Sequence, residues 1–115
     1  MKFSTKTGAP QSLSTEALIL GVFETGAQPA ITAATDKASK GLIGRIQKQG
    51  DFNGKAGTTL VVRHPEGLKA ARLVLVGLGK ADELNSKNWT QANRAAVNAV
   101  LTTTATDAIN TLTTL

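Results

Sequence analysis

An uninterrupted apolar run at residues 17–23, with the sequence ALILGVF, limits the fold more than any other feature of this chain. Its apolar residues do not alternate with polar ones, as they do in a strand that has one face in water. The run therefore predicts a β-strand buried on both faces, and such a strand lies in the centre of a sheet that is covered on each side. A chain of 115 residues is long enough for one domain of this kind, with no room for a second.

Other segments also have the composition of strands. Residues 59–63 and 72–77 are rich in β-branched and apolar residues, and the connection between them is too short for a comfortable helical crossover. We therefore expect these two strands to pair antiparallel. Residues 2–6 predict a short edge strand and residues 108–115 a last strand. Together these patterns predict an α/β fold with a mixed β-sheet flanked by helices.

A first helical pattern runs from Ile31 toward Gly50, a residue suited to a helix C-cap. Gly41 and Gly44 weaken its middle, so the segment is either one imperfect helix or two short ones. The apolar residues recur at intervals of three or four and predict the buried face: Ile31, Ala34, Ala38, Leu42 and Ile46.

A second helical pattern follows the capping residues Asn85, Ser86 and Asn88. Its spacing predicts a single helix with one face against the sheet. That face comprises Trp89, Ala92, Ala96, Val97, Val100 and Leu101.

The sequence RLVLVGLGK at residues 72–80 raises the question of a phosphate-binding loop, because glycines let main-chain N–H groups approach an anion. The spacing speaks against one, since Lys80 is followed by Ala81 and Asp82 where a phosphate loop has a hydroxyl. We interpret Gly77 and Gly79 as the end of a buried strand in a tight turn. They would supply positive φ angles or close main-chain packing there.

Residues that carry out chemistry are scarce in this sequence. His64 is the only histidine and there is no cysteine, so neither a zinc site nor a thiolate nucleophile has the ligands that it requires. Asp82 and Glu83 are adjacent, which is poor geometry for a paired acid and base. We therefore predict no catalytic, cofactor-binding or metal-binding residue in the chain, and a surface or turn position for His64.

Basic residues gather in one segment. The net charge is +5, and residues 37–48 contain Lys37, Lys40, Arg45 and Lys48 without an acidic residue. This segment is either a solvated helix face or a surface that contacts a polyanion such as DNA. The polyanion alternative requires a helix that continues through Gly41 and Gly44, because only then do the lysines fall near one another.

The N-terminal residues lack the apolar core of a signal peptide, and the run at residues 17–23 is too short to cross a bilayer. The absence of cysteine fits a reducing compartment. The sequence therefore predicts a soluble cytoplasmic protein with no membrane partner.

Several segments, in their order along the chain, resemble the N-terminal domain of bacterial leucyl aminopeptidases, also called cytosol aminopeptidases. They are MKFS at the start, GVFE at residues 21–24, GDFNGKAGTT at residues 50–59, RLVLVGLGK at residues 72–80 and DAINTLTTL at the end. The resemblance implies a macro-domain-like fold and a single accessory domain at residues 1–115, followed in the family by a larger catalytic domain. It also implies that the family's N-terminal domain continues past Leu115. We therefore expect a truncated domain whose last strand leaves an apolar face and an unpaired edge in water. Such a chain would self-associate at high concentration or have a poorly ordered C-terminal segment.

The resemblance further implies a parent enzyme that releases N-terminal amino acids, leucine preferred, from peptides. Two divalent metal ions, manganese or zinc, are held in that enzyme by the catalytic domain, whose Asn-Thr-Asp-Ala-Glu-Gly-Arg motif does not occur here. The implied partners are the catalytic domain of the same polypeptide, the other subunits of a homohexamer and, through the parent, peptide substrates. The implied role is in subunit assembly and substrate access. The macro-like fold also suggests a third alternative, a nucleotide or ADP-ribose pocket, for which we expect no binding.

Overall fold

A five-stranded mixed β-sheet forms the centre of the protein in the computed structural model, which describes residues 2–4, 12–25, 27–50 and 52–112. The strand order is β1-β5-β2-β4-β3, and all neighbours are parallel except β3 and β4. The strands are β1 (Lys2–Ser4), β2 (Leu18–Thr25), β3 (Thr59–Arg63), β4 (Arg72–Lys80) and β5 (Asp107–Asn110). The mixed sheet, the antiparallel pair and the edge position of β1 are confirmed.

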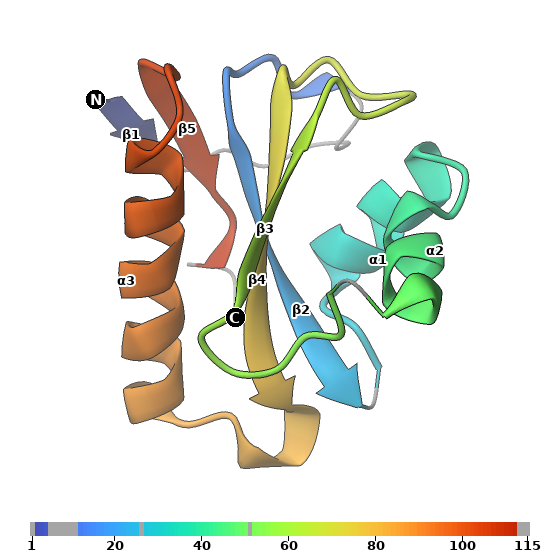
Figure 1. Ribbon diagram of the computed structural model, residues 1–115, viewed down its shortest axis with the longest axis vertical. Helices are drawn as coiled ribbons and strands as arrows, with labels where there is room; N and C mark the ends of the chain where they lie inside the picture. The colour runs from blue at the N-terminus through green and yellow to red at the C-terminus, as the bar shows by residue number, and fades with distance from the viewer. Residues whose placement is uncertain (1, 5–11, 26, 51, 113–115) are drawn as a thin grey trace.

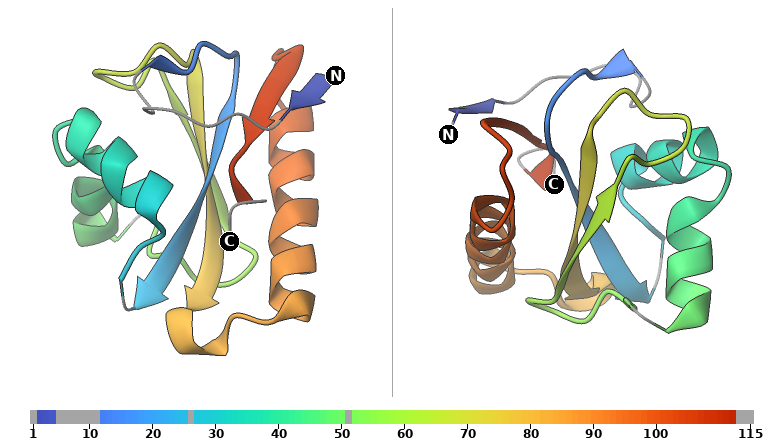
Figure 2. Two further views of the ribbon diagram at one scale, coloured as in Figure 1. Left: turned by 180° about the vertical axis from the view of Figure 1, so that it is seen from behind. Right: turned by 45° about the horizontal axis from the view of Figure 1, so that its top comes forward.

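Helices cover both faces of the sheet. In Figure 1, α1 (Ala30–Ala38) and α2 (Leu42–Gln49) lie on one side of the sheet and α3 (Ser86–Leu101) lies on the other; the view from behind in Figure 2 agrees. Successive side chains of a strand point to opposite faces, so each central strand contributes to two apolar cores. This arrangement explains why the sequence of β2 shows no alternation.

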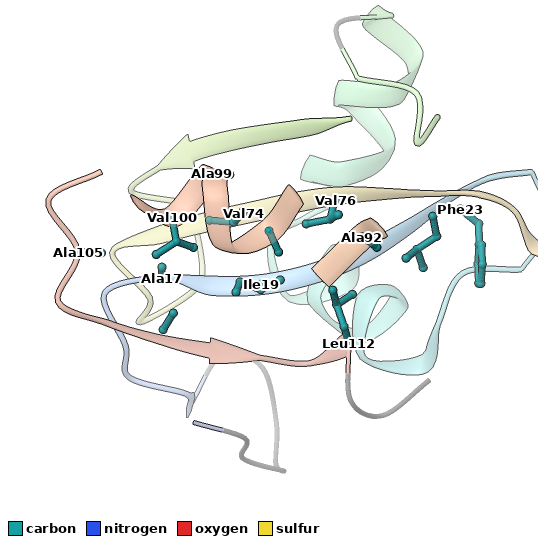
Figure 3. Packing of buried hydrophobic residues seen from close by; sticks show 13 residues of the cluster. Ala17, Ile19, Phe23, Val74, Val76, Ala92, Ala99, Val100, Ala105 and Leu112 are labelled. Atoms are coloured by element: carbon teal, nitrogen blue, oxygen red, sulfur yellow. The ribbon is translucent and has the colours of Figure 1, made fainter. Parts of the chain in front are cut away.

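The core under α3 contains Ala17 and Ile19 from the β2 segment and Val74 and Val76 from β4. These side chains lie between the sheet and the small residues of α3 (Figure 3). The core under α1 and α2 takes the intervening residues of both strands: Leu18, Leu20 and Val22 from β2, and Leu73 and Leu75 from β4. The prediction of a central strand buried on both faces is confirmed.

The first helical segment consists of two helices. Lys40 and Gly41 have positive φ angles of 60° and 79°, which end α1 and start α2 in a new direction. Gly50, with a φ of 85°, ends α2 as expected. Of the two alternatives that the sequence left open, two short helices is the correct one.

The buried face of α1 differs from the expected one. Ala34 is exposed, whereas Thr32, Thr35 and Ser39 are buried. Their hydroxyl groups donate to main-chain carbonyl groups, with Thr32 Oγ1 at 2.5 Å from the oxygen of Gly21 in β2. A hydroxyl that is satisfied in this way can be buried without a large energetic cost, and a search for apolar residues misses it.

Helix α3 begins as predicted, since the side chain of Asn85 accepts a hydrogen bond of 2.9 Å from the N–H of Asn88. Its expected buried residues Ala92, Ala96 and Val100 are confirmed. Leu101 is an error of the prediction, because 59% of it is exposed while Ala99 is buried instead. Leu101 is the last residue of the helix, and it does not lie on the face that contacts the sheet.

Two strand ends also differ from the prediction. β4 continues through Gly77 and Gly79 to Lys80, so no turn occurs at these glycines. β5 ends at Asn110 and lies between β1 and β2, so it has neighbours on both sides and the expected unpaired edge is wrong. The last part of the predicted strand, residues 113–115, lies outside the described residues, as do residues 5 and 6 of the first one.

Candidate functional site at the switch point of the sheet

The topology of the sheet defines one place where a ligand would be expected. The chain leaves β2 toward α1 on one face and leaves β4 toward α3 on the opposite face, although β2 and β4 are parallel neighbours (Figure 1). In open α/β sheets, connections that separate in this way leave a crevice at the carboxyl ends of the two strands, and ligands bind there. The ends of β2 and β4, at Thr25 and Lys80, are therefore the candidate site.

This crevice is occupied by the chain itself. Residues 52–58, which we call the crevice loop, cross from α2 past the ends of β2 and β4 before they enter β3 (Figure 1, green). The N–H groups of Gly77 and Gly79 donate to the carbonyl oxygens of Thr58 and Gly54, at 2.7 and 3.0 Å. The N–H of Gly57 donates to the oxygen of Gly77 at 3.1 Å. The amides that a phosphate would need are thus bonded to main-chain oxygens.

Glycines are required here because main chain approaches main chain. A Cβ atom on Gly77 would lie 1.9 Å from the oxygen of Lys55, a distance that no side chain permits. A Cβ on Gly54, whose φ is 93°, would lie 2.8 Å from the carbonyl carbon and oxygen of Phe23 in β2. Gly79 has a φ of 79°, so close packing at Gly77 and positive φ at Gly79 both occur, within a strand rather than a turn.

Two glutamines complete the closure at the end of β2. The pairing of β2 with β4 changes register at Phe23, which leaves the main chain of this residue to other partners. Gln28 accepts from the N–H of Phe23 at 2.7 Å and donates to its oxygen at 3.0 Å. Gln47 of α2 donates to the same oxygen at 3.3 Å and to the oxygen of Asn53 at 3.2 Å. Neither glutamine was predicted from the sequence as a functional residue, since nothing in the local pattern indicates a main-chain partner.

The surface next to the crevice loop carries a shallow feature on α3. An open depression there is lined by Ser86, Lys87, Thr90, Gln91 and Arg94, all of them exposed and all from α3. Gln91 lies against the crevice loop, because a Cβ on Gly57 would be 2.9 Å from its Nε2. The depression is therefore a surface feature of one helix.

The opposite end of the sheet is held together by carboxylates. Thr15 Oγ1 and the N–H of Glu16 donate to Asp107 Oδ1 at 2.6 and 2.9 Å, which joins the start of β2 to the start of β5. Thr106 donates to the carboxylate of Glu16 through its hydroxyl and through its N–H. These two hydrogen bonds, the hydroxyl's first, lower the pKa of Glu16 below its ordinary value of 4.5. The guanidinium of Arg72, at the start of β4, donates to the main-chain oxygen of Glu16 at 3.1 Å and to Thr104 Oγ1 at 2.8 Å.

The predicted polyanion contacts are distributed over two helices. Lys37 is in α1, Arg45 and Lys48 are in α2, and Lys40 lies at the break between them. Lys40 pairs with Glu66 at 3.3 Å, and the guanidinium of Arg45 donates to the carbonyl of Lys40. The continuous helix that the polyanion alternative required is absent from this stretch, and DNA binding itself stays a prediction.

His64 follows β3 with a φ of 52°, and its N–H donates to the oxygen of Ala71 at 2.9 Å. Its position is at the start of the connection between β3 and β4, and its side chain is exposed. Across the described ranges, no three His, Cys, Asp or Glu side chains gather as a metal ion requires. None of the helices in those ranges is long and apolar enough to cross a membrane.

The sequence of this chain is similar to those of known proteins. The profile of the cytosol aminopeptidase family, N-terminal domain, matches residues 19–115. This chain belongs to the cytosol aminopeptidase family. Among curated relatives, a probable cytosol aminopeptidase of Cupriavidus pinatubonensis is 44% identical over 117 residues, covering 95% of this chain and 23% of the relative. A probable cytosol aminopeptidase of Ralstonia nicotianae is 40% identical over 122 residues, covering 98% of this chain and 24% of the relative. The chain thus spans about a quarter of the length of these aminopeptidases.

Solved structures agree with this relationship at the level of the fold. A mutant of tomato leucine aminopeptidase superimposes with a TM-score of 0.70 at 22% identity, over 96% of this chain and 22% of that one. The macrodomain of Mycobacterium tuberculosis DarG superimposes with a TM-score of 0.67 at 10% identity, over 94% of this chain and 74% of that one. The expected macro-domain-like α/β fold of the aminopeptidase N-terminal domain is confirmed.

Proposed function

We propose that this chain is the non-catalytic N-terminal domain of a cytoplasmic metallo-aminopeptidase that releases N-terminal amino acids, leucine preferred, from peptides. One observation carries the proposal. The chain matches the N-terminal domain of the family, and it covers 23% of the length of a relative named as a probable cytosol aminopeptidase. Residues 1–115 would then form one accessory domain, and peptide cleavage would take place in a catalytic domain of the same polypeptide.

The geometry of the switch point supports a non-catalytic role. At the carboxyl ends of β2 and β4, main-chain groups of Gly77 and Gly79 are bonded to the crevice loop, and those of Phe23 are bonded to two glutamines. The residues present also do not fit the two divalent metal ions, manganese or zinc, of the proposed parent, because no group of three ligating side chains exists within residues 2–4, 12–25, 27–50 and 52–112. We therefore assign these ions to the catalytic domain.

An activity assay tests the assignment. The purified 115-residue chain, supplied with manganese or zinc, should not hydrolyse leucinamide, because bridging metals that activate water need clustered carboxylates. Metal-dependent turnover that stays with the chain through successive purification steps would contradict the proposal.

We further propose that the domain contributes to contacts between the subunits of a homohexamer and to the access of peptides to the active sites. The test compares the longer enzyme with a variant that lacks these residues. Light scattering should show a smaller particle without the domain, and the ratio of kcat/KM for a long peptide to that for leucinamide should change. An unchanged particle mass together with an unchanged ratio would contradict both roles.

A polyanion-binding module is the alternative function. It is favoured by the net charge of +5 and by the basic residues Lys37, Lys40, Arg45 and Lys48. Against it, the continuous helix that would bring the lysines together is replaced by α1 and α2, and Lys40 already pairs with Glu66. Neutralising several phosphates must make the affinity fall steeply with salt, because bound counterions are released. A duplex DNA affinity that does not depend on salt would exclude this alternative.

A further inference from the structure

At the end of β4, main-chain N–H groups already have hydrogen-bond acceptors within the chain, whereas a ligand site needs N–H groups that are free. A diphosphate binds at a switch point through free N–H groups that point into the crevice. Here the N–H groups of Gly77 and Gly79 already donate to main-chain oxygens of the crevice loop. At the end of β2, the N–H of Phe23 donates to Gln28 at 2.7 Å. These three N–H groups at the ends of the two strands therefore already have acceptors within the chain.

The crevice loop also fills the space itself. A Cβ atom added to Gly77 would lie 1.9 Å from the oxygen of Lys55, and one added to Gly54 would lie 2.8 Å from the carbonyl group of Phe23, so no layer of atoms fits between loop and strands. Gln47 ties the loop to α2 through Asn53, and Gln91 of α3 lies against Gly57. A ligand would have to displace main chain that is held from both faces of the sheet and would leave buried polar groups without partners.

We propose that the crevice loop is a permanent intramolecular occupant of the switch-point crevice, which closes this macro-like domain to nucleoside diphosphate ligands. The loop takes the place of the ligand with main-chain atoms of the same chain. Because it is covalently tethered beside the crevice, its effective concentration exceeds that of a free metabolite. The domain would thus keep the fold without keeping an open ligand site at the switch point.

Amide NMR of the 115-residue chain, titrated with ADP-ribose to millimolar concentration, tests the proposal. The amide signals of Phe23, Gly54, Gly77 and Gly79 should stay in place throughout the titration. Saturable shifts at these four amides would overturn the proposal, since they would show that the crevice opens to a nucleoside diphosphate.

A pair of glycine variants tests the role of the loop independently. Gly54 and Gly50 have similar φ angles of 93° and 85°, but a Cβ on Gly54 meets the main chain of Phe23, while one on Gly50 meets nothing within 4 Å. Gly54→Ala should therefore accelerate amide exchange of Gly79 relative to that of Val74 by about tenfold, and Gly50→Ala should leave this ratio unchanged. Equal ratios in the two variants would overturn the proposal, and the ADP-ribose titration of the unsubstituted chain decides if Gly54→Ala does not fold.

Discussion

At the carboxyl ends of the parallel strands, main-chain groups join β4 to the crevice loop, and the neutral side chains of Gln28 and Gln47 bond to Phe23 of β2. At the amino ends, β2, β4 and β5 are joined by the charged side chains of Glu16, Arg72 and Asp107. The first end depends on shape, since added atoms have no room there, and the second depends on ionisation. The two ends of one sheet should therefore respond to different perturbations, namely substitution of small residues and change of pH.

The largest effect is expected from Gly77→Ala at the carboxyl end. The new Cβ would lie 1.9 Å from the oxygen of Lys55, so either the crevice loop or the strand must move. We expect the free energy of unfolding to fall by about 3 kcal/mol or more, at the upper end for overpacking. Urea denaturation measures this change.

The matched control is Gly44→Ala in α2, where the nearest atom to the new Cβ is 3.8 Å away. Alanine favours a helix by up to about 1 kcal/mol over glycine, so this variant should be as stable as the original chain or more stable. If the two variants were equally stable, the close approach at Gly77 would have no energetic consequence, and the comparison between the two ends would fail.

A smaller effect at the same end is expected from the glutamines. Gln28→Ala removes both hydrogen bonds of Gln28 with Phe23 and leaves the N–H of Phe23 without this partner. The expected loss of stability is about 1 to 3 kcal/mol, the usual range for an unsatisfied buried group. Gln47→Ala removes two longer bonds, while the oxygen of Phe23 keeps Gln28, so about 0.5 kcal/mol is expected. Urea denaturation measures both losses of stability. A larger loss in Gln47→Ala than in Gln28→Ala would show that the closure at the end of β2 depends mainly on α2.

The smallest effect belongs to the amino end and depends on pH. Hydrogen bonds from Thr106 lower the folded-state pKa of Glu16 below its ordinary value of 4.5, so the carboxylate contributes stability above that value. This contribution is lost as the pH falls from about 4.5 through the lower folded-state pKa. The stability difference between the original chain and Glu16→Gln should therefore shrink across that window. A constant difference from neutral pH to below the folded-state pKa would argue against the role of ionisation.

The sequence predicted those parts of the fold that depend on burial of apolar side chains. Residues 17–23 indicated a central strand because both faces are buried, and Asn85 indicated the start of α3 because capping is local. It did not predict the partners of Gln28 and Gln47, because a polar side chain can bond to any main chain that the tertiary fold brings near. The sequence indicated a structural role for the glycines of RLVLVGLGK. It did not indicate that the crevice loop packs on them, because the two segments are separated along the chain.

Hydrogen exchange at Gly77 and Gly79 tests most directly the claim that the chain closes its own switch point. Both N–H groups donate to the crevice loop, so we expect their protection to lie within about tenfold of that of Val74 and Val76 in the centre of β4. Exchange of Gly77 and Gly79 at the rates of exposed loop amides, with Val74 and Val76 still protected, would contradict the account, because the crevice would then stand open in the native state.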